Sequence, residues 1–118
     1  MNEVLKQMGK ILINVAVIVL IIAAIALKVM GLKILYVSTD SMEPTFRTNQ
    51  LVLAEKVTGD DVEVGDICTY KSIGTLYTVT HRVIGTDGDK LVFKGDNNED
   101  PDPKPISRDR VIYRAVLY

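Results

Sequence analysis

Cysteine, histidine and tryptophan are nearly absent from this chain, which has one cysteine, one histidine and no tryptophan in 118 residues. The single cysteine, Cys68, excludes an internal disulfide, and a zinc site would have to draw on several carboxylates. A net charge of −1 with no basic stripe gives no indication of a nucleic-acid partner. Phosphate-binding and dinucleotide-binding glycine motifs are missing as well, so we expect neither a metal nor a cofactor.

The one long hydrophobic run lies near the amino terminus, where residues 11–27 are apolar except at Asn14. Extended over residues 4–30, the run is long enough to span a bilayer as a helix. A cleavable signal peptide is the rival interpretation, but the apolar run is long for one. We therefore predict a retained transmembrane anchor at residues 1–31, and lysines on both sides of the run leave its orientation open.

Residues 32–118 change to a strand-like pattern rich in Val, Ile, Thr and Tyr, with Gly, Asp, Asn and Pro between the runs. The pair Asp87-Gly88 predicts a tight hairpin turn. We expect a mainly β protein, in which the anchor precedes a compact all-β domain built as a coiled sheet or partial barrel. The predicted strands are residues 32–37, 50–57, 66–71, 75–85, 90–94 and 110–117.

Ser41 and His81 are the first candidates for chemistry. Ser41 lies in the stretch STDSMEPTF, whose proline and methionine are unusual for a polar linker. Strand alternation places His81 on one face with Tyr77, Val79 and Val83. His81 is then either a satisfied core histidine or a general base, because imidazole titrates near neutral pH.

Four acids crowd the loop that follows the predicted strand at residues 90–94, namely Asp96, Glu99, Asp100 and Asp102. One interpretation is a solvated acidic turn, which could also bind calcium weakly. The other is that one of these acids orients His81. A serine hydroxyl needs a base to take its proton, and the base works best beside a carboxylate. Residue types and order alone do not decide between these interpretations.

Five segments in the same order resemble boxes of the type I signal peptidases, the membrane-anchored serine endopeptidases of family S26. The segments are SMEPT, QLVLAEKV, GDICTY, THRVIG and KGDNNEDPD. The resemblance implies that Ser41 is the nucleophile and His81 the general base. His81 stands where the usual bacterial form has lysine, which resembles the endoplasmic-reticulum and archaeal type with a Ser-His-Asp arrangement.

In that type, the aspartate six residues past Asp96 serves the histidine, and this position is Asp102. The resemblance also gives Asp96 a functional role and leaves Asp100 as a third choice, because Pro101 departs from the subtype's usual second acid. The implied oxyanion hole combines the backbone N–H of Ser41 with the hydroxyl of Thr39.

The implied activity is removal of signal peptides from preproteins, after small residues at −1 and −3, through an acyl-enzyme. The implied location is the cell membrane, or the endoplasmic-reticulum membrane in a eukaryote, with one span and an extracytoplasmic domain at residues 32–118. Expected partners are preprotein signal peptides, the lipid bilayer and the secretion machinery. We also expect Met42 and Phe46 to form an apolar patch on the membrane surface.

Two other functions fit parts of the pattern. A self-cleaving repressor-type protease would use a lysine base and carry a DNA-binding domain, and the sequence indicates neither. A membrane-tethered β domain that binds peptides without cutting them stays open from the residues alone.

Overall fold

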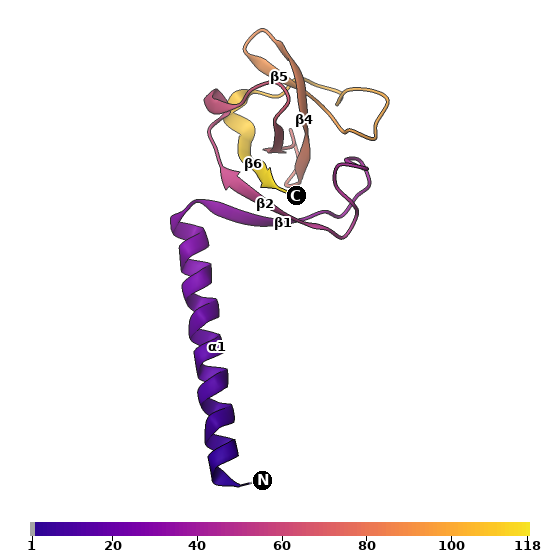
Figure 1. Cartoon of the computed structure of the whole chain (residues 1–118). Helices are drawn as coiled ribbons and strands as arrows, with labels where there is room; N and C mark the ends of the chain where they lie inside the picture. Colours follow the sequence, from indigo (N-terminus) through magenta and orange to yellow (C-terminus); the bar gives the residue numbers. More distant parts are fainter. Residues whose placement is uncertain (1) are drawn as a thin grey trace. The chain divides into compact units, whose positions relative to one another are not determined.

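The computed structural model describes residues 2–118 and divides into two units, one ending at Gly31 and one formed by Leu32–Tyr118. The first unit is a continuous helix, α1, over Glu3–Val29 (Figure 1). The Asn2 side chain caps it by accepting from the Leu5 N–H at 2.9 Å, and Gly31 follows its end with a φ of 70°. By length and composition, α1 is able to cross a membrane.

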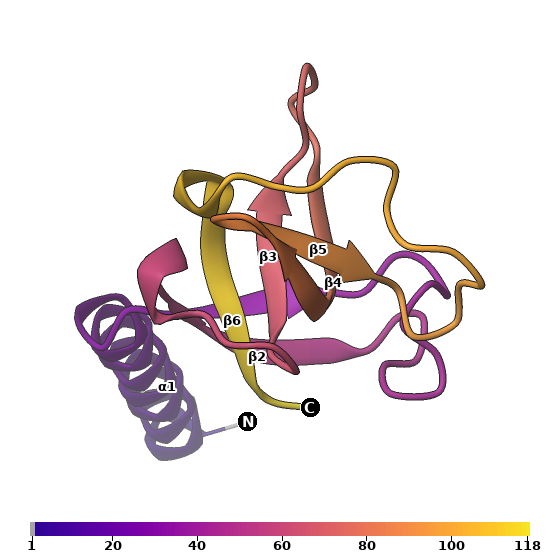
Figure 2. The same ribbon diagram turned by 90° about the horizontal axis from the view of Figure 1, so that it is seen from above.

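The second unit is a six-stranded sheet in the order β1-β2-β6-β3-β4-β5, and every neighbouring pair is antiparallel. Figure 2 shows its strands crossing at steep angles, so the sheet coils. The mainly β fold predicted behind an apolar amino-terminal helix is therefore confirmed. The strands are β1 (Leu32–Tyr36), β2 (Leu51–Lys56), β3 (Ile67–Lys71), β4 (Thr78–Asp87), β5 (Lys90–Lys94) and β6 (Val111–Leu117).

Side-chain alternation explains the strands, as in β5, where Leu91 and Phe93 are buried and the residues between and beside them are not. The hairpin between β4 and β5 is also as predicted, but its turn lies one residue later. Asp87 pairs with Lys90, so the two loop residues are Gly88 and Asp89, and Gly88 takes a φ of 62°.

Two apolar clusters fill the domain. One lies under β3, β4 and β5, and the other under β2 and the segment that follows β1. The first contains Val62, Cys68, Tyr70, Val83, Leu91, Phe93, Ile106 and Val111, and the second contains Met42, Phe46, Val52 and Ile67.

The predicted membrane patch of Met42 and Phe46 is therefore wrong, because both side chains are core residues with 2% and 1% of their surface exposed. The rings of Phe46 and Tyr118 pack edge to face, with their centroids 4.9 Å apart. Apolar side chains that are exposed in this domain lie elsewhere, on β1, at the start of β2, at the end of β6 and at the tip of the β3–β4 hairpin. They include Ile34, Leu51, Leu76 and Leu117.

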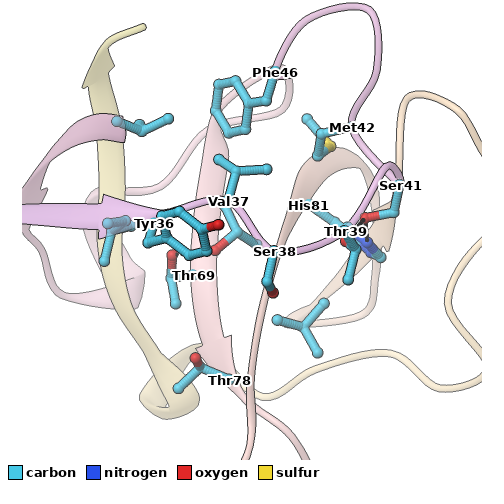
Figure 3. Close-up of a pocket in the computed structure, with 14 residues that line it drawn as sticks. Tyr36, Val37, Ser38, Thr39, Ser41, Met42, Phe46, Thr69, Thr78 and His81 are labelled. Atoms are coloured by element: carbon cyan, nitrogen blue, oxygen red, sulfur yellow. Dashed lines mark hydrogen bonds between the residues drawn. The ribbon is translucent and has the colours of Figure 1, made fainter. Parts of the chain in front are cut away.

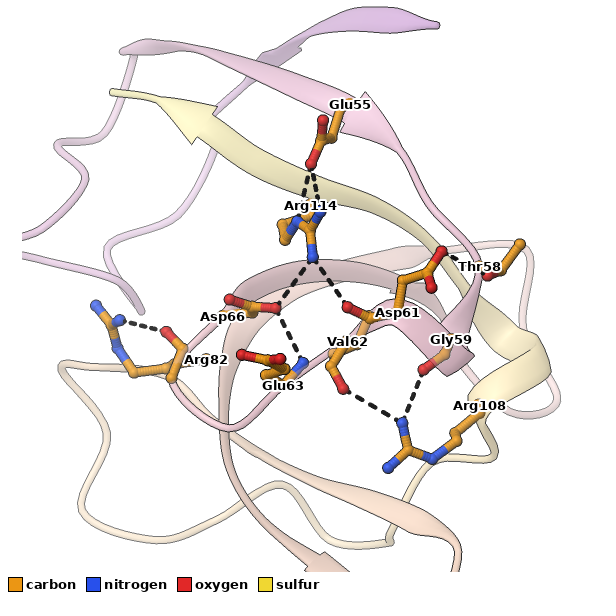
Figure 4. Close-up of polar contacts among 11 residues, drawn as sticks. Glu55, Thr58, Gly59, Asp61, Val62, Glu63, Asp66, Arg82, Arg108 and Arg114 are labelled. Atoms are coloured by element: carbon orange, nitrogen blue, oxygen red, sulfur yellow. Dashed lines mark hydrogen bonds and ion pairs between the residues drawn. The ribbon is translucent and has the colours of Figure 1, made fainter.

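Polar side chains hold the irregular connections to the sheet (Figure 4). Arg114 of β6 donates to Glu55 at 2.6 Å and to the Asp61 carbonyl at 3.0 Å. The 3₁₀ turn η1 (Gly59–Asp61) lies against η2 (Arg108–Arg110), and Arg108 donates to the Gly59 carbonyl at 2.8 Å. A Cβ on Gly59 would lie 1.9 Å from the Arg108 carbonyl oxygen, so the close approach requires glycine.

Candidate active site

Ser41 lies in a run of tight turns after β1, and the loop after β5 fixes its backbone. The Asn97 N–H donates to the Ser41 carbonyl at 2.9 Å, and the Asn97 side chain donates to the Asp40 carbonyl at 3.1 Å. Gly95 passes so close that a Cβ there would lie 2.6 Å from the Ser41 carbonyl oxygen. The two loops are therefore locked together at the position of the hydroxyl.

His81 extends from β4 between Ser41 and Asp102. Its Nε2 lies 3.0 Å from Ser41 Oγ, and its Nδ1 lies 2.8 Å from Asp102 Oδ1 and 2.9 Å from Oδ2. An ionised carboxylate only accepts hydrogen bonds, so Nδ1 donates to it. In the neutral imidazole Nε2 is then an acceptor, and the Ser41 hydroxyl donates to it. This chain of bonds is able to move the Ser41 proton onto His81.

Burial and β-strand register keep the imidazole in this position. His81 is 9% exposed and pairs with Cys68 of β3, on the same face of β4 as the buried Val83 and the half-buried Val79. Tyr77, which was expected on this face, precedes β4 and is exposed. Asp102 arrives from the loop after β5, where its backbone N–H donates to the Phe93 carbonyl at 2.8 Å.

Thr39 lies beside the same hydroxyl, with Oγ1 3.1 Å from Ser41 Oγ. The only hydroxyl proton of Ser41 goes to His81, so the Thr39 hydroxyl donates to Ser41 Oγ. Thr39 thus lies beside the attacking oxygen, whereas an oxyanion donor has to reach the carbonyl oxygen of the substrate. Its contribution to an oxyanion hole stays a prediction.

Asp96 does not contact His81 in the described chain. Its carboxylate binds Arg82 through two hydrogen bonds of 2.9 Å and accepts a third from the Thr45 hydroxyl at 2.6 Å. Arg82 in turn donates to the Gly65 carbonyl at 2.8 Å. The Arg82 guanidinium, followed by the Thr45 hydroxyl, lowers the pKa of Asp96. Asp96 therefore ties β4 to the Ser41 turn.

The other loop acids, Glu99 and Asp100, are exposed. No cluster of three His, Cys, Asp or Glu side chains suited to a metal ion occurs among residues 2–118. The structure joins four of the predicted residues in one chain of hydrogen bonds, which runs from Thr39 through Ser41 and His81 to Asp102. Asp96 is not part of this chain and instead binds Arg82 and Thr45.

Tyr70 of β3 is a neighbour that the sequence reasoning missed. Its hydroxyl donates to Asp102 Oδ2 at 2.5 Å, and its ring packs on Phe93 with the centroids 4.6 Å apart. Burial, and then the bond to Asp102, raises the pKa of Tyr70. The only signal in the sequence was its position two residues after Cys68, on the strand that pairs with His81.

An open cavity of about 450 Å³ adjoins the Ser41 hydroxyl (Figure 3). One wall comes from β1 and the residues that follow it, and the other comes from the start of β4. Its apolar base includes the buried Met42, Phe46 and Val52. The residues along its two walls include Tyr36, Val37, Ser38, Thr78, Val79 and Thr80.

Comparisons with known proteins identify the family of the chain. The model of the family described as signal peptidase, peptidase S26, matches residues 8–108. Signal peptidase I W of Bacillus subtilis (strain 168) is 36% identical over 88 residues, which cover 70% of this chain and 46% of that protein.

Two relatives come from eukaryotic signal peptidase complexes. The catalytic subunit SEC11 of Colletotrichum graminicola is 34% identical over 82 residues, or 65% of this chain and 48% of that protein. The human catalytic subunit SEC11C is 37% identical over 71 residues, which cover 56% of this chain and 37% of that protein. The chain thus spans less than half the length of these curated relatives. The match along residues 8–108, together with the Ser41–His81–Asp102 geometry, makes this chain a member of the signal peptidase family S26.

Proposed function

We propose that this chain is a membrane-anchored serine endopeptidase that removes signal peptides from preproteins. Ser41 is the nucleophile, His81 the general base and Asp102 the carboxylate that orients it. The observation that carries the proposal is the unbroken hydrogen-bond chain from Ser41 Oγ through His81 to Asp102, with contacts of 3.0 and 2.8 Å.

The proposed reaction has two halves. Ser41 Oγ attacks the scissile carbonyl carbon while His81 Nε2 takes the hydroxyl proton, and then the C–N bond breaks. The same proton passes from His81 to the departing amine of the mature protein, leaving the signal peptide as an ester on Ser41. A water molecule gives its proton to His81 and attacks the ester, which releases the signal peptide carboxylate and restores the serine hydroxyl.

Negative charge develops on the carbonyl oxygen in both halves, and the proposed donors to it are the Ser41 N–H and the Thr39 hydroxyl. The 3.1 Å contact between Thr39 Oγ1 and Ser41 Oγ supports this choice. Removal of one such donor typically costs about 2.7–4 kcal/mol of transition-state stabilisation. Asp96 acts in this scheme only through Arg82 and Thr45, as a residue that positions the Ser41 turn.

The substrate seat proposed for the preprotein lies between two strand edges. Strand β1 pairs with β2 alone in the described chain, and β5 pairs with β4 only from Arg82 onward. Residues 36–38 and 78–80 therefore offer backbone groups to an extended peptide that enters the cavity between them. We assign the cavity beside Ser41 to the side chains at the −1 and −3 positions of such a peptide, which are proposed to be small.

The proposed location is a membrane, with α1 as the single span within the described chain and residues 32–118 on the extracytoplasmic side. The apolar length of α1 supports the anchor. Relatives from both a bacterium and eukaryotic signal peptidase complexes leave the cell membrane and the endoplasmic-reticulum membrane as alternatives. The proposed partners also include secretion machinery, because the SEC11 relative is a subunit of a signal peptidase complex.

The test uses the full chain in proteoliposomes with a preprotein that carries alanine at −1 and −3. We expect cleavage by the natural chain and by the control Ser107→Ala, a serine outside the cavity. Ser41→Ala and His81→Ala are expected to abolish it. Binding of the preprotein without cleavage by any form would instead support the peptide-binding alternative, and robust cleavage by His81→Ala would refute the assigned base.

A further inference from the structure

The Asp102 carboxylate is held from two sides by different elements. His81 Nδ1 of β4 lies 2.8 and 2.9 Å from its two oxygens, and the Tyr70 hydroxyl of β3 lies 2.5 Å from Oδ2. Neither contact is exposed, because Tyr70 is 4% and His81 9% exposed. Within the reaction derived above, the second contact has no assigned task.

We infer that Tyr70 is a positioning residue, whose hydroxyl fixes the rotation of the Asp102 carboxylate and draws negative charge away from His81. The inference rests on the proposed function, since it assigns a task at the same site. It extends the chain of groups from three to four, in the order Ser41, His81, Asp102 and Tyr70.

Rigidity suits Tyr70 to this task. Its ring is part of the domain core and packs against Phe93, whose carbonyl also accepts the Asp102 N–H. Phe93 thus contacts both partners, because its ring packs on Tyr70 and its carbonyl binds the Asp102 backbone. The Asp102 carboxylate lies in a loop between Pro101 and Pro103, and a donor from the domain core gives it a defined orientation.

The hydroxyl also changes the charge that His81 meets. A carboxylate that accepts a strong hydrogen bond at one oxygen offers less charge to a partner at the other. With Tyr70 present, Asp102 stabilises a proton on the imidazole less than a lone carboxylate would. Without the hydroxyl, Asp102 stabilises the imidazolium that forms during the reaction more strongly.

Other ionisable groups near His81 do not provide this control. Cys68 faces it across the β3–β4 register, but burial raises the pKa of that thiol to about 12, so it is neutral. Arg82 is the next residue of β4 and is bonded to Asp96. Removal of the Tyr70 hydroxyl oxygen therefore changes the hydrogen bonding of Asp102 without altering another ionisable neighbour of His81.

The experiment compares Tyr70→Phe with the control Tyr77→Phe, a tyrosine that is 77% exposed. Phenylalanine keeps the ring that packs on Phe93 and removes only the hydroxyl. For Tyr70→Phe we expect kcat to fall roughly tenfold with KM nearly unchanged, because the base is less well oriented. We also expect the acid limb of the kcat/KM profile to move up by roughly 0.5–1 pH unit, a change that lost packing alone would not produce.

A second readout does not depend on cleavage. The chain has one histidine, so the proton on Nδ1 of its imidazole gives a single assignable magnetic-resonance signal in detergent-solubilised protein. We expect Tyr70→Phe to shift this signal and Tyr77→Phe to leave it in place. If the signal shifts but the natural chain cleaves no preprotein, the proposed function is refuted and the effect of Tyr70 on Asp102 and His81 is still supported.

A folded Tyr70→Phe variant with the natural signal and the natural acid limb would overturn the inference. Should this variant fail to fold, 3-fluorotyrosine introduced at position 70 keeps the packing and makes the hydroxyl a stronger donor. The acid limb is then expected to move to lower pH, and an unmoved limb would overturn the inference equally.

Discussion

Gly95→Ala tests the claim that the loop after β5 holds Ser41 in register with His81. The added Cβ would lie 2.6 Å from the Ser41 carbonyl oxygen, and ordinary van der Waals contact begins at 3.4 Å, so about 0.8 Å of movement is required. The Ser41 carbonyl also accepts the Asn97 N–H at 2.9 Å, which resists a movement of the loop alone.

A displacement of this size at a nucleophile is costly, since misplacement by about 1 Å lowers rates by roughly 10²-fold. We therefore expect Gly95→Ala to lower kcat by roughly 30- to 100-fold while KM changes little, because the cavity walls stay in place. The assay is cleavage of a fluorogenic peptide with alanine at −1 and −3, with circular dichroism to confirm that the variant folds.

The matched control is Gly85→Ala in the neighbouring hairpin, where an added Cβ meets nothing within 4 Å. We expect this variant to keep the natural kcat. If folded Gly95→Ala were as active as the control, the locked arrangement of the two loops would not be what aligns the hydroxyl, and the reasoning would be refuted.

Three further outcomes are expected. Asp102→Asn leaves an amide beside Nδ1, which favours the wrong tautomer, so kcat is expected to fall by roughly 10⁴-fold in the peptide assay; a loss below tenfold would contradict its role. The pKa of Asp96 is lowered in the folded chain, so its stabilisation is fully present above the ordinary carboxyl pKa. It is lost as the pH falls below that value and through the lowered pKa. Thermal unfolding of natural and Asp96→Asn protein should therefore converge at acid pH, and parallel curves would argue against the pair with Arg82. Phe46→Ala is expected to lower the unfolding free energy by about 3–5 kcal/mol, as truncation of a core residue does, without weakening vesicle binding. An unchanged unfolding free energy with weakened vesicle binding would instead support a membrane-contacting role for Phe46.

Most of the fold was predictable because its signals are local. Turn residues separate runs of β-branched and aromatic residues, and the six observed strands begin and end within a few residues of the predicted ones. The turn of the β4–β5 hairpin lies one residue late because either Asp87-Gly88 or Gly88-Asp89 supplies the glycine that a tight turn needs.

The failures have a common physical cause, which is that burial and long-range contacts are not local. Met42 and Phe46 look like surface anchors in a loop sequence, but the coiled sheet folds over them. The Tyr70–Asp102 bond joins residues 32 positions apart and depends on how the loop after β5 returns across β3. Spacing alone left all four acids of the loop, Asp96, Glu99, Asp100 and Asp102, as alternatives to serve His81, and the resemblance supplied the preference for Asp102.

Covalent labelling of the full chain tests the central claim most directly, namely that His81 activates the Ser41 hydroxyl. The reagent is a peptidyl phosphonate with alanine at its reactive end, and the adduct is located by peptide mass spectrometry. The account predicts one adduct, on Ser41, in the natural chain and none in folded His81→Ala. Equal labelling of Ser41 in His81→Ala, or an adduct on another residue, would contradict it.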